Sequence, residues 1–321
     1  MRNFFKNLST VISILFNNKI LRRPDFSEKK IFLNGKILEN QILNKKNISS
    51  LSEVEFSVFS QFGEDGIISW LSNQIPDIKK IFLEIGTQDY WESNTRYLLK
   101  SQLWKGYLIE GLKEDVNKIK KQRIYWQNNL TAICKFLNTD NINETLDKNI
   151  KEKNIGLLSI DIDGNDYWIL DKIQLESDLV VLEYNPIFGD IHRITIPYEE
   201  NFERNKKHFS NMYFGCSIKA LISLMKEKNY IFLGTNSQGM NAFFVSKSKY
   251  IYFKDKISNR DIFPPLSRDA RNIDGKLNFK NLSDNLKLIK DLEVYDLDKK
   301  TNIKLSEYKN FYSEQWSEFV Q

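Results

Sequence analysis

The chain has 321 residues, of which 41% are hydrophobic and 13% aromatic, enough for a packed core in one large α/β domain with appendages or in two small domains. Its 47 basic and 42 acidic residues give a net charge of +5 and are spread along the sequence. Because nucleic-acid binding needs a concentrated basic patch, we expect no nucleic-acid partner. The composition predicts a soluble protein, and two cysteines far apart in the sequence indicate reduced thiols in the cytoplasm. No apolar run reaches the roughly 18 residues of a membrane span.

The first 52 residues are predicted to form a segment of their own. Apolar side chains recur at helical spacing over residues 4–16, with basic residues on the other side and directly after, which predicts an amphipathic helix. Such a helix can lie on the inner face of a membrane as a peripheral anchor, or pack on its own domain or on a second subunit of a homo-oligomer. Residues 24–52 are rich in Lys and Asn, and we expect a loose connector with a turn at Asn34 and Gly35.

A short apolar run meets a tight turn at residues 81–89, whose sequence is IFLEIGTQD. The pattern predicts a buried strand that runs into a turn and then into a helix starting near Ser93 and Asn94. In an open parallel sheet, ligands bind at the carboxyl ends of the strands, and a glycine in the first strand-to-helix turn lets the backbone approach them. Gly86 therefore marks the floor of a candidate pocket.

The next predicted strand, residues 105–111, ends on an acid. Glu110 follows the glycine turn by about twenty residues, the spacing at which a carboxylate hydrogen-bonds a ribose diol in dinucleotide-binding folds. The two strand ends together predict a nucleoside-binding edge of the sheet.

The stretches SQFGEDGI at 60–67, LEIGTQDYWESNT at 83–95, YLIEG at 107–111, LLSIDIDGNDYWIL at 157–170 and LEYN at 182–185 resemble a known family. They are similar to class I S-adenosylmethionine (SAM)-dependent methyltransferases, and among these to the FkbM-like family often found in surface-polysaccharide biosynthesis. The resemblance covers about residues 59–246. It implies a Rossmann-like α/β fold, with a mostly parallel sheet, an antiparallel terminal hairpin and flanking helices. It also implies SAM as cofactor and a sugar or glycan precursor as the small-molecule acceptor.

The same resemblance implies roles for individual residues. Glu110 would contact the ribose, Asp140 or Asn141 the adenine, Gln61 and Glu64 the edge of the cofactor pocket, and a last group the methionine end: Glu84, Gly86, Thr87, Asp89 and Asn94. Two ordinary structural interpretations stay open. Glu64 and Asp65 are acids at a predicted helix start, where the helix dipole favours them, and Asn141 is spaced from Glu144 like a capping box.

Three carboxylates crowd the end of another predicted strand, at Asp161, Asp163 and Asp166. Because side chains alternate along a strand, Asp161 and Asp163 point to the same side and would repel unless they shared a proton or a cation. An oxygen-ligand site for a divalent cation such as Mg²⁺ fits this pair, which could also activate an acceptor hydroxyl. The alternative is an Asp-Gly turn followed by a helix cap.

Acids end four predicted strands, at Glu84, Glu110, Asp161 and Glu183, so we expect the substrate at that rim of the sheet. The loop at 186–202 is long enough for a lid and carries His192, a candidate general base, although a lone loop histidine is more often a surface residue. Residues 217–229 have the apolar stripe of a core helix, and residues 230–233 and 242–245 predict a hairpin. Cys134 and Cys216 are predicted to be reduced core thiols.

These observations favour a SAM-dependent O-methyltransferase with a glycan acceptor. A metal-dependent nucleotide-sugar glycosyltransferase is the first alternative, because an acid pair after a strand also holds diphosphates through a metal ion. A non-catalytic scaffold is the second, because Gly86 is the only glycine in a turn that usually carries two or three. We expect a methyltransferase-like domain at 53–250 and a C-terminal extension of loops and short helices at 251–321, with Trp316 and Phe319 docking the tail.

Overall fold

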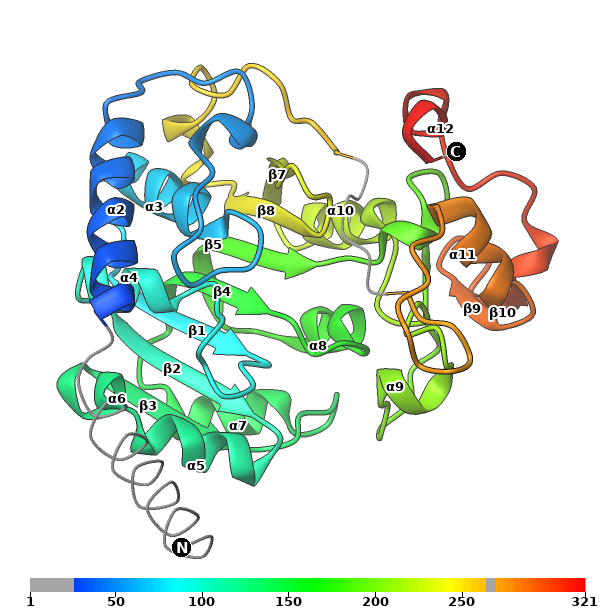
Figure 1. The fold of residues 1–321 in the computed structure, drawn as a ribbon, viewed down its shortest axis with the longest axis horizontal. Coiled ribbons are helices and arrows are strands. Elements are labelled where there is room, and N and C mark those ends of the chain that lie inside the picture. The colour runs from blue at the N-terminus through cyan, green and yellow to red at the C-terminus, as the bar shows by residue number, and fades with distance from the viewer. Residues whose placement is uncertain (1–25, 264–269, 321) are drawn as a thin grey trace, which may run out of the picture.

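The computed structural model describes residues 26–263 and 270–320. Its main element is a seven-stranded sheet with the order β3-β2-β1-β4-β5-β8-β7. Neighbours from β3 to β5 are parallel, whereas β8 is antiparallel to both β5 and β7. The strands are β1 (Ile81–Ile85), β2 (Lys105–Glu110), β3 (Leu130–Cys134), β4 (Asn154–Ile160), β5 (Glu176–Glu183), β7 (Tyr230–Thr235) and β8 (Asn241–Ser246). This is the predicted Rossmann-like sheet, with the predicted antiparallel hairpin at its end (Figure 1).

Helices cover both faces of this sheet, because its buried strands alternate apolar side chains between two cores. Phe82 packs on one side with α3 and α4, while its neighbour Leu83 packs on the other with α7, α8 and α10. The bounds of the helices are α3 (Glu64–Gln74), α4 (Arg96–Ser101), α5 (Lys113–Lys121), α6 (Arg123–Gln127), α7 (Ile142–Asn149), α8 (Asp166–Lys172) and α10 (Ile218–Glu227). The site is therefore carried by a sheet with a core on each side.

The prediction of a loose connector over residues 24–52 is wrong, because α2 (Phe26–Leu43) runs through most of it. Gly35 lies inside this helix and makes no turn. A Cβ at Gly35 would lie 2.4 Å from Cγ2 of Val58 and 3.1 Å from Cε2 of Tyr97. The glycine is thus needed for the close approach of α2 to the domain. Glycine often indicates a turn, but at this position it allows close packing.

A second, three-stranded sheet has the order β10-β9-β6. Strand β6 (Ile194–Thr195) comes from the loop after β5, whereas β9 (Glu293–Asp296) and β10 (Thr301–Lys304) come from the C-terminal segment, which also contains α11 (Leu282–Ile289) and α12 (Glu314–Val320). This sheet joins the two predicted segments on either side of residue 250, and the domain division itself stays a prediction. Trp316 is buried and its indole N–H donates to the carbonyl of Ile262 at 3.1 Å, which confirms the docked tail.

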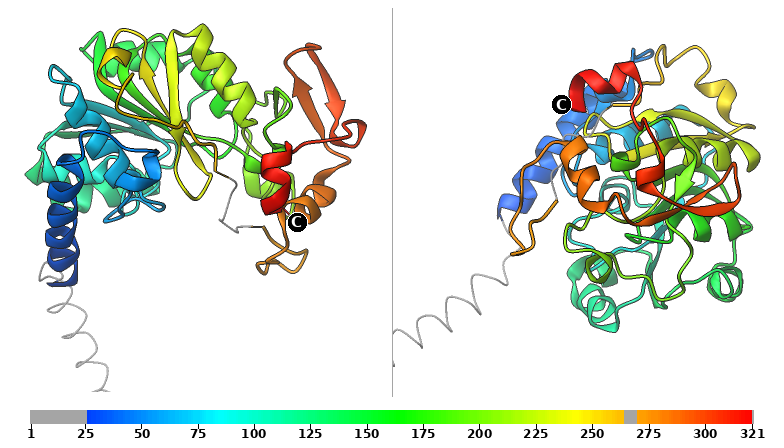
Figure 2. Two further views of the ribbon diagram at one scale, coloured as in Figure 1. Left: turned by 90° about the horizontal axis from the view of Figure 1, so that it is seen from above. Right: turned by 90° about the vertical axis from the view of Figure 1, so that its right-hand side faces the viewer.

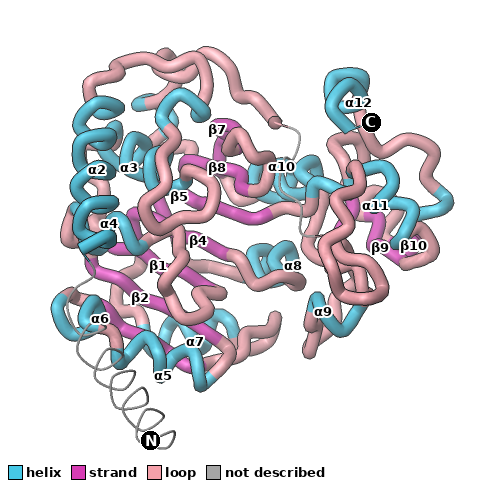
Figure 3. The backbone as a smooth tube through the Cα atoms, in the orientation of Figure 1, coloured by secondary structure: helices cyan, strands magenta, loops and turns pink. Residues whose placement is uncertain are grey.

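The small sheet lies beyond the carboxyl ends of the main strands. The arrowheads of β1, β2 and β4 point toward the side of the molecule that holds α9 (Arg204–Lys207) and α11, and loops fill the region between them (Figures 1 and 3). Seen from above, the β9–β10 ribbon stands apart from the main sheet (Figure 2). The edge of the sheet that was predicted to bind ligand therefore faces a second structural unit.

Three further expectations concern exposure and membranes. Cys216 is buried, but Cys134 is exposed, so the prediction of two core thiols is wrong for Cys134; both are free cysteines. The amphipathic helix predicted at residues 4–16 lies outside the described residues. In the parts of the chain that the structure describes, no helix combines the length and the apolar character needed to cross a bilayer.

Candidate functional site

A cavity of about 920 Å³ opens at the carboxyl ends of β1, β2 and β4. The order of the strands reverses direction between β1 and β4, and such a switch point is where open α/β sheets bind their ligands. Five predicted site residues line this cavity: Gly86, Asp89, Glu110, Asp161 and Asp163. The volume lies within the usual range of sites for small molecules and cofactors, about 300–1,000 Å³.

Gly86 forms the junction between β1 and β4. Its φ of +81° is in the left-handed region, and a Cβ there would lie 1.6 Å from the carbonyl oxygen of Asp161. The Asp161 N–H donates to the carbonyl of Ile85 at 3.0 Å, which holds the two strand ends together. The glycine therefore brings the backbone of the turn against the acidic strand end, in addition to lining the cavity.

Glu110 fixes the turn after β1. Its carboxylate accepts the backbone N–H groups of Thr87 at 3.1 Å, Gln88 at 2.9 Å and Leu112 at 2.9 Å. A carboxylate offers about four acceptor positions, so about one is left for a ligand hydroxyl. The sequence predicted that this carboxylate accepts the hydroxyl groups of a ribose. In the structure, most of its hydrogen-bond acceptor positions are occupied by backbone N–H groups of the protein.

Three carboxylates from two strand ends meet on the other wall. Oxygen atoms of Asp161, Asp163 and Glu183 all lie within 4.8 Å of one another. The Oε2 atom of Glu183 is buried and has no hydrogen-bond partner. Burial, together with the carboxylates of Asp163 and Asp166, raises the pKa of Asp161 to about 8, and burial with the Asp161 carboxylate raises the pKa of Glu183 as well. Asp161 therefore retains a proton near neutral pH when no cation is bound.

Arg204, on α9, supplies positive charge at this cluster. Its guanidinium forms an ion pair with Asp163, donates to the carbonyl of Asn211 at 2.7 Å and stacks on the ring of Phe214 at 3.8 Å. The side chain is only 15% exposed. One guanidinium beside several carboxylates leaves the wall with an excess of negative charge at high pH.

Asp166 belongs to the turn between β4 and α8. Its carboxylate accepts the N–H groups of Ile162 and Gly164, both at 2.8 Å. This agrees with the alternative interpretation of the sequence, in which an Asp-Gly turn leads into a helix. The turn and the carboxylate cluster coexist, because Asp166 serves the turn while Asp161 and Asp163 line the cavity.

Several residues predicted to touch the cofactor hold the loop after β1 instead. Glu84 is buried and accepts from the Ser93 hydroxyl at 2.6 Å, from the Asn94 N–H at 2.9 Å and from the Thr95 hydroxyl. The Asn94 side chain donates to the Ser159 hydroxyl at 3.1 Å. Glu84, Thr87 and Asn94 are not among the cavity-lining residues, so they shape the site through its supporting loop.

The predicted pocket edge at the start of α3 lies elsewhere as well. Glu64 is buried and accepts from the side-chain amides of Asn236 and Asn241, both at 2.8 Å, which ties α3 to the β7–β8 hairpin. Asp65 accepts three backbone N–H groups from residues 58–60. Gln61 is exposed, and neither Gln61 nor Glu64 lines the cavity. These acids serve the local fold, as the alternative interpretation proposed, through hydrogen bonds as well as through the helix dipole.

The predicted adenine contact and general base are also outside the cavity. Asp140 is exposed, and the Asn141 side chain bonds the backbone of Asn138 and Phe136, so the predicted capping box does not form. His192 bonds the carbonyl of Asn310 and packs against Tyr308, with ring centroids 4.6 Å apart. The cause is the small sheet: the C-terminal segment packs on the loop at 186–202 and holds this histidine away from the site.

The cavity also uses residues that the sequence did not single out as ligands. Its outer wall includes Phe202, Arg204 and four asparagines, namely Asn165, Asn201, Asn205 and Asn211. The Oδ1 atom of Asn165 is buried without a hydrogen-bond partner. Glu183 could have been added to the metal ligands from its place at a strand end. No local pattern marks Arg204, Asn201, Asn205 or Asn211, because their position depends on how the chain folds after β5.

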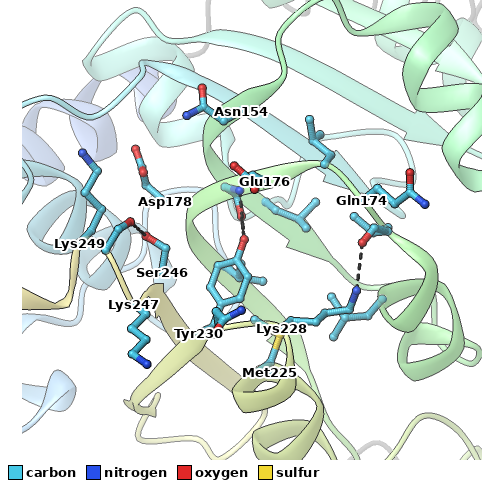
Figure 4. Close-up of a pocket in the computed structure, with 18 residues that line it drawn as sticks. Asn154, Gln174, Glu176, Asp178, Met225, Lys228, Tyr230, Ser246, Lys247 and Lys249 are labelled. Carbon is cyan, nitrogen blue, oxygen red and sulfur yellow. Dashed lines mark hydrogen bonds between the residues drawn. The ribbon is translucent and has the colours of Figure 1, made fainter.

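A second cavity, of about 450 Å³, lies at the opposite edge of the sheet, beside the starts of β4 and β5 (Figure 4). Its polar groups are largely engaged with the protein itself: the Tyr230 hydroxyl meets Ser177 at 3.1–3.2 Å, and the Lys228 ammonium donates to the carbonyl of Ile173 at 3.0 Å. None of the predicted site residues lines it. The cavity at the switch point is therefore the candidate site.

Comparison with known proteins gives similarities in structure only. No family model matches the chain, and the search of curated proteins found no match. Among solved structures, the N-terminal domain of EvdMO1 with SAH bound has 11% identity, a TM-score of 0.38, and coverage of 57% of this chain and 79% of that one. The O-methyltransferase from Bacillus cereus in complex with SAH has 12% identity, a TM-score of 0.35, and coverage of 73% and 95%.

A third similar structure, the CurJ carbon methyltransferase, has 12% identity and a TM-score of 0.38, with coverage of 61% of this chain and 56% of that one. Values of this size support no conclusion about this chain. The fold itself is that of a Rossmann-like α/β protein, as its own sheet order shows. The chemistry has to follow from the residues of the cavity.

Proposed function

We propose that this chain is a SAM-dependent O-methyltransferase of the FkbM-like kind, acting on a sugar or glycan precursor. The observation that carries the proposal is the cavity at the switch point, which joins Gly86 and Glu110 on one wall to Asp161, Asp163 and Glu183 on the other. Glu183 belongs to that wall through its contact with the two aspartates. One small molecule with a nucleoside part and one acceptor hydroxyl would span these two walls.

The residues present fit SAM in part. Glu110 retains about one acceptor position for a ribose hydroxyl, and the buried Oδ1 of Asn165 lacks a partner that a bound molecule could supply. SAM supplies an electrophilic methyl group when it is bound. Asp89 and Gly86 would lie along it, since both line the same cavity as Glu110.

The acidic cluster would serve the acceptor. Methyl transfer needs an aligned hydroxyl and a group that takes its proton. The raised pKa of Asp161 makes its carboxylate a stronger base than an exposed aspartate, and Asp163 and Glu183 would accept further hydroxyl groups. Alternatively, a divalent cation such as Mg²⁺ would be held by Asp161, Asp163 and Glu183 and would lower the pKa of the hydroxyl.

The outer wall supports a polyhydroxylated acceptor. A side-chain amide both donates and accepts hydrogen bonds, as a sugar hydroxyl does, and four asparagines line this wall. Phe202, at the same wall, offers an apolar ring face. Amides beside an aromatic ring and carboxylates suit a sugar better than an apolar acceptor.

Isothermal titration with SAM and with its demethylated product SAH tests the proposal. We expect both to bind the wild type, and Glu110→Gln to weaken binding by about tenfold or more, since it replaces an acceptor at a charged hydrogen-bond site. Asp140→Asn is the matched control, because this acid is exposed and does not line the cavity. Binding heat with a nucleotide-diphosphate sugar and none with SAM would favour the glycosyltransferase. Absence of binding heat with all of these ligands would favour the non-catalytic scaffold.

A second measurement addresses the cation. Thermal unfolding with and without Mg²⁺ should show a higher Tm with the ion in the wild type, and no shift in Asp161→Asn or Glu183→Gln. An equal absence of a shift in the wild type would leave Asp161 as a metal-free base.

A further inference from the structure

The turn after β1 contains two residues in an unfavourable backbone conformation. Within residues 86–90, which we name the β1 turn, Gly86 has a φ of +81°, Gln88 of +46° and Tyr90 of +64°. Residues other than glycine rarely adopt left-handed backbone, and they persist there only where the surrounding structure holds them. The β1 turn also lines the cavity at the switch point through Gly86, Gln88 and Asp89. The contacts that hold Gln88 and Tyr90 therefore shape one wall of the site.

The first half of the β1 turn is held by Glu110, and the second half by Arg96 and Gln122. The Arg96 guanidinium donates to the carbonyl of Tyr90 at 2.7 Å. The side-chain amide of Gln122 donates to the carbonyl of Asp89 at 2.6 Å. The amide oxygen of Gln122 in turn accepts from the same guanidinium at 2.8 Å, so Arg96 and Gln122 act on the turn as a connected pair.

Arg96 is a buried charge with a well-defined position. Its side chain is only 3% exposed, and its guanidinium lies 4.6 Å from the centre of the Trp91 ring and 5.0 Å from that of Phe59. The carboxylate of Glu28, on α2, lies 3.7 Å away. Burying a charge is costly unless the charge is paired and hydrogen-bonded, so the guanidinium needs the Tyr90 carbonyl as much as the turn needs the guanidinium. This mutual dependence favours a single arrangement of the turn.

We infer that Arg96 and Gln122 are positioning residues, which hold the β1 turn in the conformation that receives the methyl donor. The inference rests on the proposed function, because that function assigns the turn to SAM. Glycine would adopt left-handed backbone without strain, but Gly86 is the only glycine of this turn, and the two side chains supply the missing support from outside. Neither side chain lines the cavity, so both act through the backbone of Asp89 and Tyr90.

Isothermal titration of the full chain with SAH tests the effect on binding. Gln122→Ala removes the hydrogen bond to the Asp89 carbonyl and should raise the Kd for SAH by about fivefold or more. Arg96→Gln should raise the Kd by about tenfold or more, and Gln122→Ala still decides the question if the arginine variant does not fold. Gln102→Ala is the matched control, because this half-buried amide also bridges two side chains, but its partners lie outside the β1 turn. Its Kd should equal that of the wild type.

Removal of the backbone strain separates the positioning of the turn from a general loss of stability. Gln88→Gly allows the left-handed conformation without strain. Gln122→Ala should therefore raise the Kd for SAH by about twofold or less in the Gln88→Gly background, against about fivefold or more in the wild type. A general loss of stability would be additive and would weaken binding equally in both backgrounds.

Backbone amide exchange in the ligand-free protein gives a readout that does not depend on SAM. The N–H groups of Gln88 and Tyr90 donate to the Glu110 carboxylate and to the Thr87 carbonyl. They should exchange severalfold faster in Gln122→Ala, and at the wild-type rate in the control variant. The inference is overturned if their exchange is unchanged in Gln122→Ala, or if this variant loses equal affinity in both backgrounds. Faster exchange in a protein that binds no SAH would instead overturn the proposed function, and the assignment of the turn to SAM with it.

Discussion

Replacing Gly86 by alanine should separate the cost of its backbone conformation from the cost of its close approach to β4. Gly275 is a suitable control, because its φ of +79° nearly equals the +81° of Gly86, but no atom lies within 4 Å of the position that a Cβ would take there. Gly275→Ala should therefore cost only the left-handed strain, about 1–2 kcal/mol, reduced by the lower entropy of the unfolded alanine chain.

Gly86→Ala carries the same strain and a clash with rigid backbone. Its Cβ would lie 1.6 Å from the Asp161 carbonyl oxygen, so the two strand ends would have to move apart. That movement would break the hydrogen bond from the Asp161 N–H to the Ile85 carbonyl. Overpacking costs about 1–3 kcal/mol and a lost buried hydrogen bond about 1–3 kcal/mol, which gives a total near 4 kcal/mol.

The assay is urea unfolding of both variants, with the free energy of unfolding compared to the wild type. Because both variants share the left-handed strain, we expect Gly86→Ala to lose about 4 kcal/mol more than Gly275→Ala. Because the Asp161 end would be displaced, SAM binding should also fall in Gly86→Ala and not in Gly275→Ala. Equal losses of stability in the two variants would refute the assignment of Gly86 to the junction of β1 and β4.

Three more changes have defined outcomes. Because the pKa of Asp161 is raised, the folded protein holds a proton that the unfolded chain releases. The free energy of unfolding without metal should therefore fall as the pH rises from about 4 to about 8. Asp161→Asn should flatten this pH dependence in urea unfolding, and an unchanged pH dependence would contradict the prediction. Arg204→Lys keeps the positive charge but loses the planar guanidinium, with its hydrogen bond to Asn211 and its stacking on Phe214. The variant should lose about 1–2 kcal/mol of unfolding free energy. A stability equal to that of the wild type would show that Arg204 has no structural role. Gly35→Ala should destabilise the protein by about 1 kcal/mol despite the gain in helix propensity, because the new Cβ would clash with Val58. The control Asn34→Ala, at an exposed position of the same helix, should stabilise the protein slightly. A higher Tm for Gly35→Ala in thermal unfolding would show that the Val58 side chain moves aside at little cost.

The main sheet could be predicted from the sequence because its strands are buried on both faces and appear as short apolar runs between polar turns. The run at 81–85 and the hairpin at 230–246 are read from neighbouring residues alone. Helix α2 could not be predicted from the sequence, because Asn34 and Gly35 are typical turn residues. The residues that pack closely at Gly35, Val58 and Tyr97, are distant in the sequence. At Gly35, tertiary packing therefore outweighs the local preference for a turn.

The same distinction applies to the site. Gly86, Glu110 and Asp161 were placed together because parallel strands bring their carboxyl ends to one edge. Asp140 and His192 lie in loops, where strand geometry gives no constraint, and both lie outside the cavity. The roles of the predicted cofactor and metal ligands remain predictions, and the titrations above address them.

The pairing of β6 with β9 has a consequence for the order of synthesis. All seven strands of the main sheet have left the ribosome once residue 246 has emerged, so the inner wall of the cavity can assemble early. The β6 strand finds its partner only when residues 293–296 follow, some fifty positions later. Nascent chains would thus hold a formed main sheet while β6 is still unpaired, and the small sheet would be completed only after residues 293–296 have emerged.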